Sequence, residues 1–215
     1  MNLPNKLTML RVIMIPVFVF FILAGFIPYN NYIALGIFIL ASLTDLLDGK
    51  IARAKNLVTN FGKFMDPLAD KLLVITALLC LLVVDNGTRI CDNQILALVA
   101  ILVIVAREFI ISGFRLVASD AGIVIAASMW GKFKTATTMV AICFMIVVKD
   151  LSAFLPFLKE VTLVLFWISV TLTIVSLVDY LGKNIHVITD MGDKKASNPT
   201  SAPVSESVTD NQQNI

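Results

Sequence analysis

Six long apolar stretches constrain the fold of this 215-residue chain more than any other feature. They cover residues 9–26, 32–48, 64–84, 95–117, 133–148 and 157–180. A helix that crosses a bilayer needs about 20 mainly apolar residues. The chain is 58% hydrophobic and 15% charged, whereas a soluble domain is about half apolar and about a quarter charged. The pattern predicts an all-α integral membrane protein with six transmembrane helices and a short N-terminal interfacial segment, and it excludes an ordinary soluble domain.

The distribution of Lys and Arg predicts how the chain is oriented in the membrane. If the N-terminus lies in the cytosol, the outer links hold only Arg89, Lys149 and Lys159. The positive-inside tendency then predicts that both termini are cytosolic. Nucleic-acid binding is not expected, because no basic stripe stands apart from the apolar stretches. We predict one membrane domain over residues 1–192 and a disordered cytosolic tail over 193–215, which is rich in Ser, Thr, Asn and Pro.

Residues 42–73 (SLTDLLDGKIARAKNLVTNFGKFMDPLADKLL) carry four aspartates at the inner ends of two predicted spans. Asp45 and Asp48 are three residues apart and Asp66 and Asp70 are four apart, so each pair shares one helix face. The link between the two helices is short, and the helices therefore run antiparallel with all four carboxylates at a similar depth. A single such aspartate is often a helix–helix hydrogen bond or a proton relay. Four phased oxygen ligands instead favour two hard cations, Mg²⁺ or Mn²⁺.

The residues around the aspartates favour a phosphorylated ligand. The guanidinium of Arg53 could hold a phosphate bidentately, and Gly49 and Gly62 would allow a ligand or a helix to approach closely. A divalent-cation transporter would also need a cluster of carboxylates, but the fixed positive charge of Arg53 would repel its substrate. A membrane prenyltransferase would carry its acidic residues on well-separated segments.

The motif resembles the complete signature of the CDP-alcohol phosphotransferase family. Its spacing is Asp45-x2-Asp48-Gly49-x2-Ala52-Arg53-x8-Gly62-x3-Asp66-x3-Asp70. The flanks 2–11, 59–73, 106–116 and 131–135 resemble the members that use sn-glycerol 3-phosphate as the acceptor, and the resemblance extends to about residue 180. It implies a homodimeric six-span enzyme of phospholipid biosynthesis that displaces CMP from CDP-diacylglycerol. Inositol phosphate, serine and phosphatidylglycerol remain alternative acceptors.

The resemblance also implies roles for individual residues. Asp45, Asp48, Asp66 and Asp70 would hold two divalent cations, and Asp70 would in addition accept the proton of the acceptor hydroxyl. The CDP-lipid site would be lined by Asn5, Thr8, Asp48, Gly49, Ala52, Arg53, Gly62 and Asp66.

Glycerol 3-phosphate is a dianion and would need a cationic site of its own. The candidates are Arg107, Arg115, Lys132 and Lys134. Arg107 lies deep in an apolar stretch, and Lys132 and Lys134 lie at a helix start, where the helix dipole disfavours cations; both facts favour a phosphate partner. Alternatively, Arg107 pairs with an aspartate of the motif and the two lysines anchor the helix at the inner membrane surface. Trp130 and Tyr180 are predicted at membrane interfaces.

Overall fold

The computed structural model describes residues 3–55, 60–84, 93–120 and 128–196. For the helical residues 3–5, 46–55, 60–67, 70, 120 and 185–196 it describes the course of the backbone and not the side chains. The described residues form six helices and no strand, which confirms the predicted all-α class. The helices are α1 (Leu3–Leu23), α2 (Asn30–Lys55), α3 (Asn60–Val83), α4 (Gln94–Asp120), α5 (Met129–Leu151) and α6 (Leu158–Ala196).

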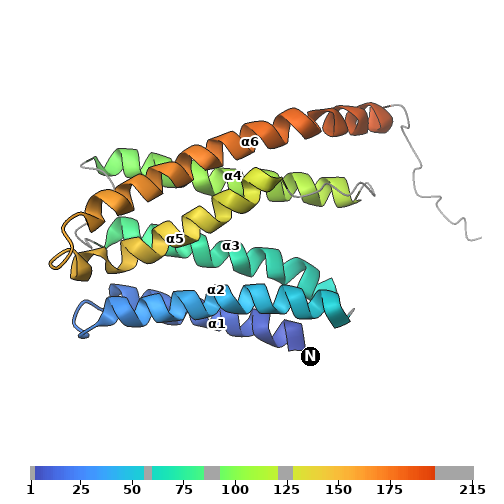
Figure 1. Ribbon diagram of the computed structural model, residues 1–215. Helices are drawn as coiled ribbons and strands as arrows, with labels where there is room; N and C mark the ends of the chain where they lie inside the picture. The colour runs from blue at the N-terminus through green and yellow to red at the C-terminus, as the bar shows by residue number, and fades with distance from the viewer. Residues whose placement is uncertain (1–2, 56–59, 85–92, 121–127, 197–215) are drawn as a thin grey trace, which may run out of the picture.

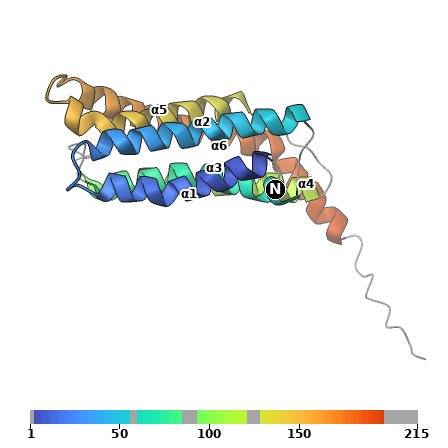
Figure 2. The same ribbon diagram turned by 90° about the horizontal axis from the view of Figure 1, so that it is seen from below.

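The six helices run alternately up and down, side by side, in one elongated bundle (Figures 1 and 2). α1 packs against α2 and α3, α5 packs against α6 and α2, and α4 packs against α6. We call the end of the bundle at which α2 ends and α3 begins the motif end. α1 and α5 also begin at this end, α4 ends there, and α6 projects beyond it (Figure 1). The predicted antiparallel arrangement of the two aspartate-bearing helices is confirmed.

Apolar side chains face both the interior and the outside of the bundle. Phe18, Phe38 and Phe166 are fully buried in the core cluster, while large apolar side chains such as Phe20 and Leu102 stay exposed. Several charged and polar side chains are buried instead, Arg11 among them. A bundle in lipid needs no polar surface over its spanning length, and its charged groups are stable only inside, next to partners. The distribution fits a bilayer rather than water.

Four helices in the described part of the chain are long and apolar enough to cross a membrane. They are Lys6–Leu23, Gln94–Ser119, Met129–Leu151 and Leu158–Asn184, and α3 adds a shorter apolar segment, Lys71–Val83. By length and composition the chain is therefore a multi-pass membrane protein. The second and third predicted spans, in α2 and α3, end in or begin with the aspartate motif, and neither qualifies by this measure over its described residues. The count of six spans thus stays a prediction.

The helices extend beyond the apolar stretches from which they were predicted. α2 continues to Lys55 and α4 to Asp120, because the backbone of a helix does not need to stop where its apolar surface stops. α6 reaches Ala196, four residues beyond the domain boundary predicted at residue 192; residues 197–215 lie outside the described part. α1 runs without interruption from Leu3 to Leu23, so its first residues form no separate N-terminal segment in the structure.

Candidate functional site

A cavity of about 510 Å³ opens among five helices and includes one aspartate of the motif in its wall. Its volume lies in the range of small-molecule sites. Its charged lining residues in the described part of the chain are Asp45 of α2, Lys71 of α3, Arg107, Glu108 and Arg115 of α4, and Lys132 of α5. Three of the four predicted acceptor-site cations thus line one cavity together with Asp45.

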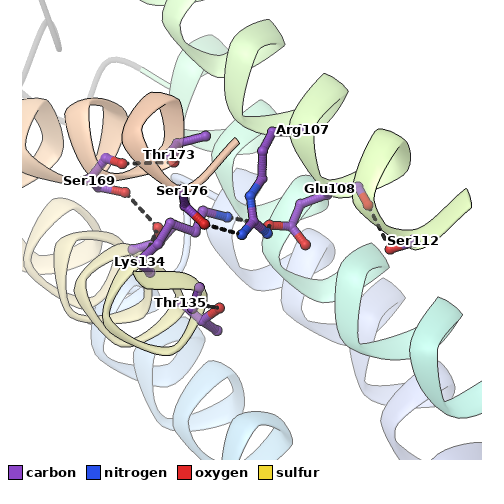
Figure 3. Close-up of polar contacts among 10 residues, drawn as sticks. Arg107, Glu108, Ser112, Lys134, Thr135, Ser169, Thr173 and Ser176 are labelled. Carbon is purple, nitrogen blue, oxygen red and sulfur yellow. Dashed lines mark hydrogen bonds and ion pairs between the residues drawn. The ribbon is translucent and has the colours of Figure 1, made fainter. Parts of the chain in front are cut away.

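Arg107 and Lys134 converge on the carboxylate of Glu108, as Figure 3 shows. Nη1 of Arg107 donates to Oε1 of Glu108 at 3.1 Å, and Nζ of Lys134 forms an ion pair with the same oxygen. Arg107 is 7% exposed and Lys134 is 2% exposed. Buried charges in a bundle of this kind are stable only when they are paired. Within the described residues, the carboxylate that pairs with Arg107 is therefore Glu108 of its own helix, rather than the predicted alternative, an aspartate of the motif.

The guanidinium of Arg107 is also held from α6. Its Nη2 donates to Oγ of Ser176 at 2.6 Å. Gly131 of α5 lies directly beside this contact, since a Cβ at this position would be 3.3 Å from Nη2 of Arg107. The absence of a side chain at Gly131 therefore lets the arginine pack between α5 and α6. The buried Nε of Arg107 has no hydrogen-bond partner in the described structure, and so one donor of this cavity-lining side chain is unused.

Lys132 and Lys134 differ in environment although they are two residues apart. Both lie in the first turns of α5, as predicted, but Lys132 is exposed and lines the cavity, whereas Lys134 is buried against Glu108 and does not line it. Arg115 is exposed as well, and its guanidinium carbon lies 5.9 Å from the ring centre of Tyr180. Within the described residues, neither Arg115 nor Lys132 forms an ion pair with a carboxylate. These two cations remain available to an anion in the cavity.

Asp45 connects the cavity with α1. Its Oδ1 lies 2.9 Å from Nη1 of Arg11, which is completely buried, while the Asp45 side chain is 29% exposed. An arginine at the predicted inner end of the first span would be explained by the positive-inside tendency alone, but in the structure Arg11 is an interior ion-pair partner of a motif carboxylate. The ion pair therefore holds the Asp45 carboxylate between α1 and the cavity.

The other predicted ligand residues lie mostly where side chains are not described. Thr8 is buried in α1 towards the motif end. The remaining CDP-site and metal-site candidates occupy helical backbone at that end, but their side chains lie outside the described residues: Asn5, Asp48, Gly49, Ala52, Arg53, Gly62, Asp66 and Asp70. The described residues hold no group of three or more His, Cys, Asp or Glu side chains that could bind a metal ion. The side chains of the other three predicted ligands, Asp48, Asp66 and Asp70, are not described. The predicted donor set consists of carboxylates alone, which suits Mg²⁺ or Mn²⁺.

Sequence reasoning missed three residues of this region. Glu108 carries the strongest available signal, because a carboxylate within a long apolar stretch must have a partner. Ser176 has no distinguishing signal, since serine is common in membrane helices. Tyr180 was assigned to a membrane interface, but it is 2% exposed and lines the cavity. Its side chain packs against α4 instead of facing lipid, and its depth in the membrane stays a prediction.

The fold and the cavity together define a multi-pass helical membrane protein with a cationic polar cavity at the level of its aspartate motif. Comparison with known proteins places it more narrowly. Residues 1–175 match the model of the CDP-alcohol phosphatidyltransferase family, and the chain belongs to this family.

Bacterial relatives share much of the chain's length. The chain is similar to the CDP-diacylglycerol–glycerol-3-phosphate 3-phosphatidyltransferases of Bacillus subtilis, with 40% identity over 85% of this chain and 95% of the relative, and of Rickettsia felis, with 41% identity over 81% of this chain and 91% of the relative. The enzyme of the same name from Haemophilus influenzae is 35% identical over 84% of this chain and 91% of the relative.

Proposed function

We propose that this protein transfers the phosphatidyl group of CDP-diacylglycerol to sn-glycerol 3-phosphate and releases phosphatidylglycerophosphate and CMP. The family membership supports the reaction type. The names of the similar bacterial enzymes support both the lipid donor and the acceptor. A divalent-cation transporter gains no support from these relatives.

The observation that carries the acceptor assignment is the charge of the cavity. The negative charges of Asp45 and Glu108 are balanced by buried partners, Arg11 for the first and Lys134 with Arg107 for the second. The exposed cations Arg115 and Lys132 add positive charge to the same cavity. A phosphate monoester dianion such as sn-glycerol 3-phosphate or inositol phosphate matches that excess, whereas serine, which is neutral overall, does not. Between these two phosphates, the names of the similar enzymes favour sn-glycerol 3-phosphate. Arginine and lysine together suit a phosphate because one offers a bidentate fork and the other a compact point charge.

Two divalent cations, Mg²⁺ or Mn²⁺, would be held by Asp45, Asp48, Asp66 and Asp70. When bound, such ions stabilise negative charge on the diphosphate of the donor lipid. The position of Asp45 in the wall of the cavity supports this assignment. Gly49, Ala52 and Gly62 would leave room for the nucleotide beside these carboxylates, and Arg53 would contact a phosphate. Asn5 and Thr8, near the start of α1, would complete the CDP site.

The proposed reaction is a substitution at the phosphorus that carries the diacylglycerol. The acceptor hydroxyl oxygen forms a bond to this phosphorus, and the bond between the phosphorus and the oxygen of CMP breaks. Asp70 accepts the proton that the hydroxyl loses. The cations of the cavity hold the phosphate of the acceptor, so that its hydroxyl is positioned and the two reactants react as one assembled complex.

This chemistry suits a protein in the inner membrane of a bacterium, with six spans and with both termini in the cytosol. The soluble acceptor would then reach the motif end directly, and the donor lipid would enter sideways from the bilayer. Lys149 and Lys159 lie near the opposite end of the bundle, which fits the predicted bias of charges. A homodimer follows from the family resemblance.

Release of CMP by the purified protein tests the proposed function. With CDP-diacylglycerol in detergent micelles and Mg²⁺, we expect CMP release only when sn-glycerol 3-phosphate is added. A chelator should stop it and added Mg²⁺ or Mn²⁺ should restore it. Inositol phosphate, serine and phosphatidylglycerol serve as control acceptors. Equal release with one of these would contradict the acceptor assignment, and release with none would contradict the enzyme class.

Replacing Gly131 by alanine tests whether the position of the Arg107 guanidinium matters for binding of the acceptor. The added methyl group would lie 3.3 Å from Nη2 of Arg107 and 3.8 Å from Oγ of Ser176, so the guanidinium must shift by a fraction of an ångström. We expect the KM for sn-glycerol 3-phosphate to rise about threefold, because small misplacements of a positioning group weaken binding. Gly113→Ala is the matched control, since a Cβ there meets nothing within 4 Å. Equal KM values for the two variants would refute a role of Arg107 in the acceptor site.

A further inference from the structure

The hydroxyl group of Tyr180 is buried and has no hydrogen-bond partner in the described structure. The residue is 2% exposed and belongs to the wall of the cationic cavity. Buried tyrosine hydroxyls nearly always find a partner, because an unpaired polar group away from water is costly. An unpaired hydroxyl on a residue that lines a cavity therefore points to a partner that is present only when the cavity is filled.

The ring of Tyr180 is held by its neighbours and not by its hydroxyl. The ring of Phe114 contacts it edge to face, with 5.7 Å between the ring centres. The guanidinium of Arg115 lies 5.9 Å from the ring centre, within the range of a cation–π contact. Both neighbours belong to α4, and the tyrosine belongs to α6. The packing of these two helices therefore fixes where the hydroxyl lies before any ligand binds.

We propose that the Tyr180 hydroxyl donates a hydrogen bond to an anionic oxygen of the acceptor bound in the cavity. The proposal rests on the proposed function and adds a specificity residue to it. Phosphate oxygens accept hydrogen bonds and cannot donate them, and a tyrosine hydroxyl can donate one without adding charge to an already cationic site. Hydrogen bonds to charged oxygens are about twice as strong as those between neutral groups. The separate cation–π contact with the ring of Tyr180 positions the Arg115 guanidinium in the wall of the same cavity.

Tyr180→Phe removes the hydroxyl and keeps the ring, and it is the variant that tests the proposal. We expect the KM for sn-glycerol 3-phosphate to rise about tenfold, which corresponds to about 1.4 kcal/mol, while the KM for CDP-diacylglycerol stays unchanged. The thermal stability of the ligand-free protein should not fall, because the hydroxyl has no partner to lose. Tyr32→Phe is the matched control: Tyr32 is 41% exposed on α2, near the end of the bundle opposite the motif end, and its variant should leave both KM values unchanged.

Three results would overturn the proposal. An unchanged KM for the acceptor would exclude the contact. A rise in the KM for CDP-diacylglycerol alone would assign the hydroxyl to the diphosphate of the donor lipid. A lower melting temperature of the ligand-free variant, with an unchanged acceptor KM, would make the hydroxyl a structural one.

A binding measurement separates this proposal from the proposed function. Added sn-glycerol 3-phosphate, without CDP-diacylglycerol, should raise the melting temperature of the wild-type protein and raise that of Tyr180→Phe much less. If the wild-type protein released no CMP but showed this difference, the proposed reaction would be wrong while the Tyr180 contact would stand. If the protein released CMP but the two melting curves shifted equally, the Tyr180 contact would be wrong and the reaction would stand.

Discussion

Replacing Asp70 by asparagine is expected to reduce CMP release by about 10²–10⁴-fold, the range typical for loss of a general base. Asn has the same shape as Asp but can neither accept the proton of the acceptor hydroxyl nor contribute negative charge to a metal site. Asp70 is the last aspartate of the motif and lies in the first half of α3, close to the motif end. The measurement is the rate of CMP release at saturating concentrations of both substrates.

Asp150→Asn is the matched control for the Asp70 variant. Asp150 lies near the end of α5 away from the motif end, and its Oδ2 accepts a hydrogen bond from Nδ2 of Asn31 at 3.0 Å. An asparagine can keep that bond through its carbonyl oxygen, so the rate should remain close to that of the wild-type protein. An Asp70→Asn variant that is as active as this control would show that Asp70 is not the general base.

Replacing Lys134 by methionine is expected to lower stability by roughly 3 kcal/mol. Removing one partner of a buried ion pair typically costs 3–5 kcal/mol, and the lower end applies because Arg107 still contacts Glu108. The measurement is the melting temperature of the ligand-free protein in detergent. Lys132→Met provides the control from the same helix: its side chain is exposed, so its melting temperature should not change, whereas its KM for sn-glycerol 3-phosphate should rise.

A double-mutant cycle makes the Lys134 result specific. Glu108→Gln removes the same ion pair from its other side, so the stability losses of Lys134→Met and Glu108→Gln should not add in the double variant: it should lose less than the sum of the two single variants. Two outcomes would contradict the assigned ion pair: Lys134→Met and Lys132→Met losing equal stability, or the losses of the two single variants adding in full in the double variant.

The sequence could have predicted in part that Lys132 and Lys134 face different surroundings. Successive residues of an α-helix are separated by about 100° around its axis, so Lys132 and Lys134 point about 200° apart and cannot both face one ligand in the same way. Both lysines were nevertheless assigned to the acceptor site. The helical period excludes a shared direction, but it does not say which lysine faces the cavity, because that depends on how α5 is rotated against α4 and α6.

For Tyr180 and Arg11, too, the sequence alone does not show which way the side chain faces. A tyrosine at the end of an apolar stretch is typical of a membrane interface, and an arginine near a cytosolic end is typical of a topology charge. Both residues are buried in the structure. Whether such a residue faces lipid, water or a neighbouring helix depends on the contacts between helices, and hydropathy along one chain carries no information about these contacts.

The sequence by itself determined the all-helical class, the alternation of apolar stretches and links, the position of the aspartate motif on two consecutive helices, and the family. These features follow from local composition and spacing along the chain. Only the tertiary structure decided which charges neutralise one another and which stay available. The pairs Arg11–Asp45 and Lys134–Glu108 join different helices, and an ion pair depends on the distance between two groups in space. The cavity that joins Asp45 to Arg115, Lys132 and Tyr180 arises for the same reason, since it exists only where five helices meet.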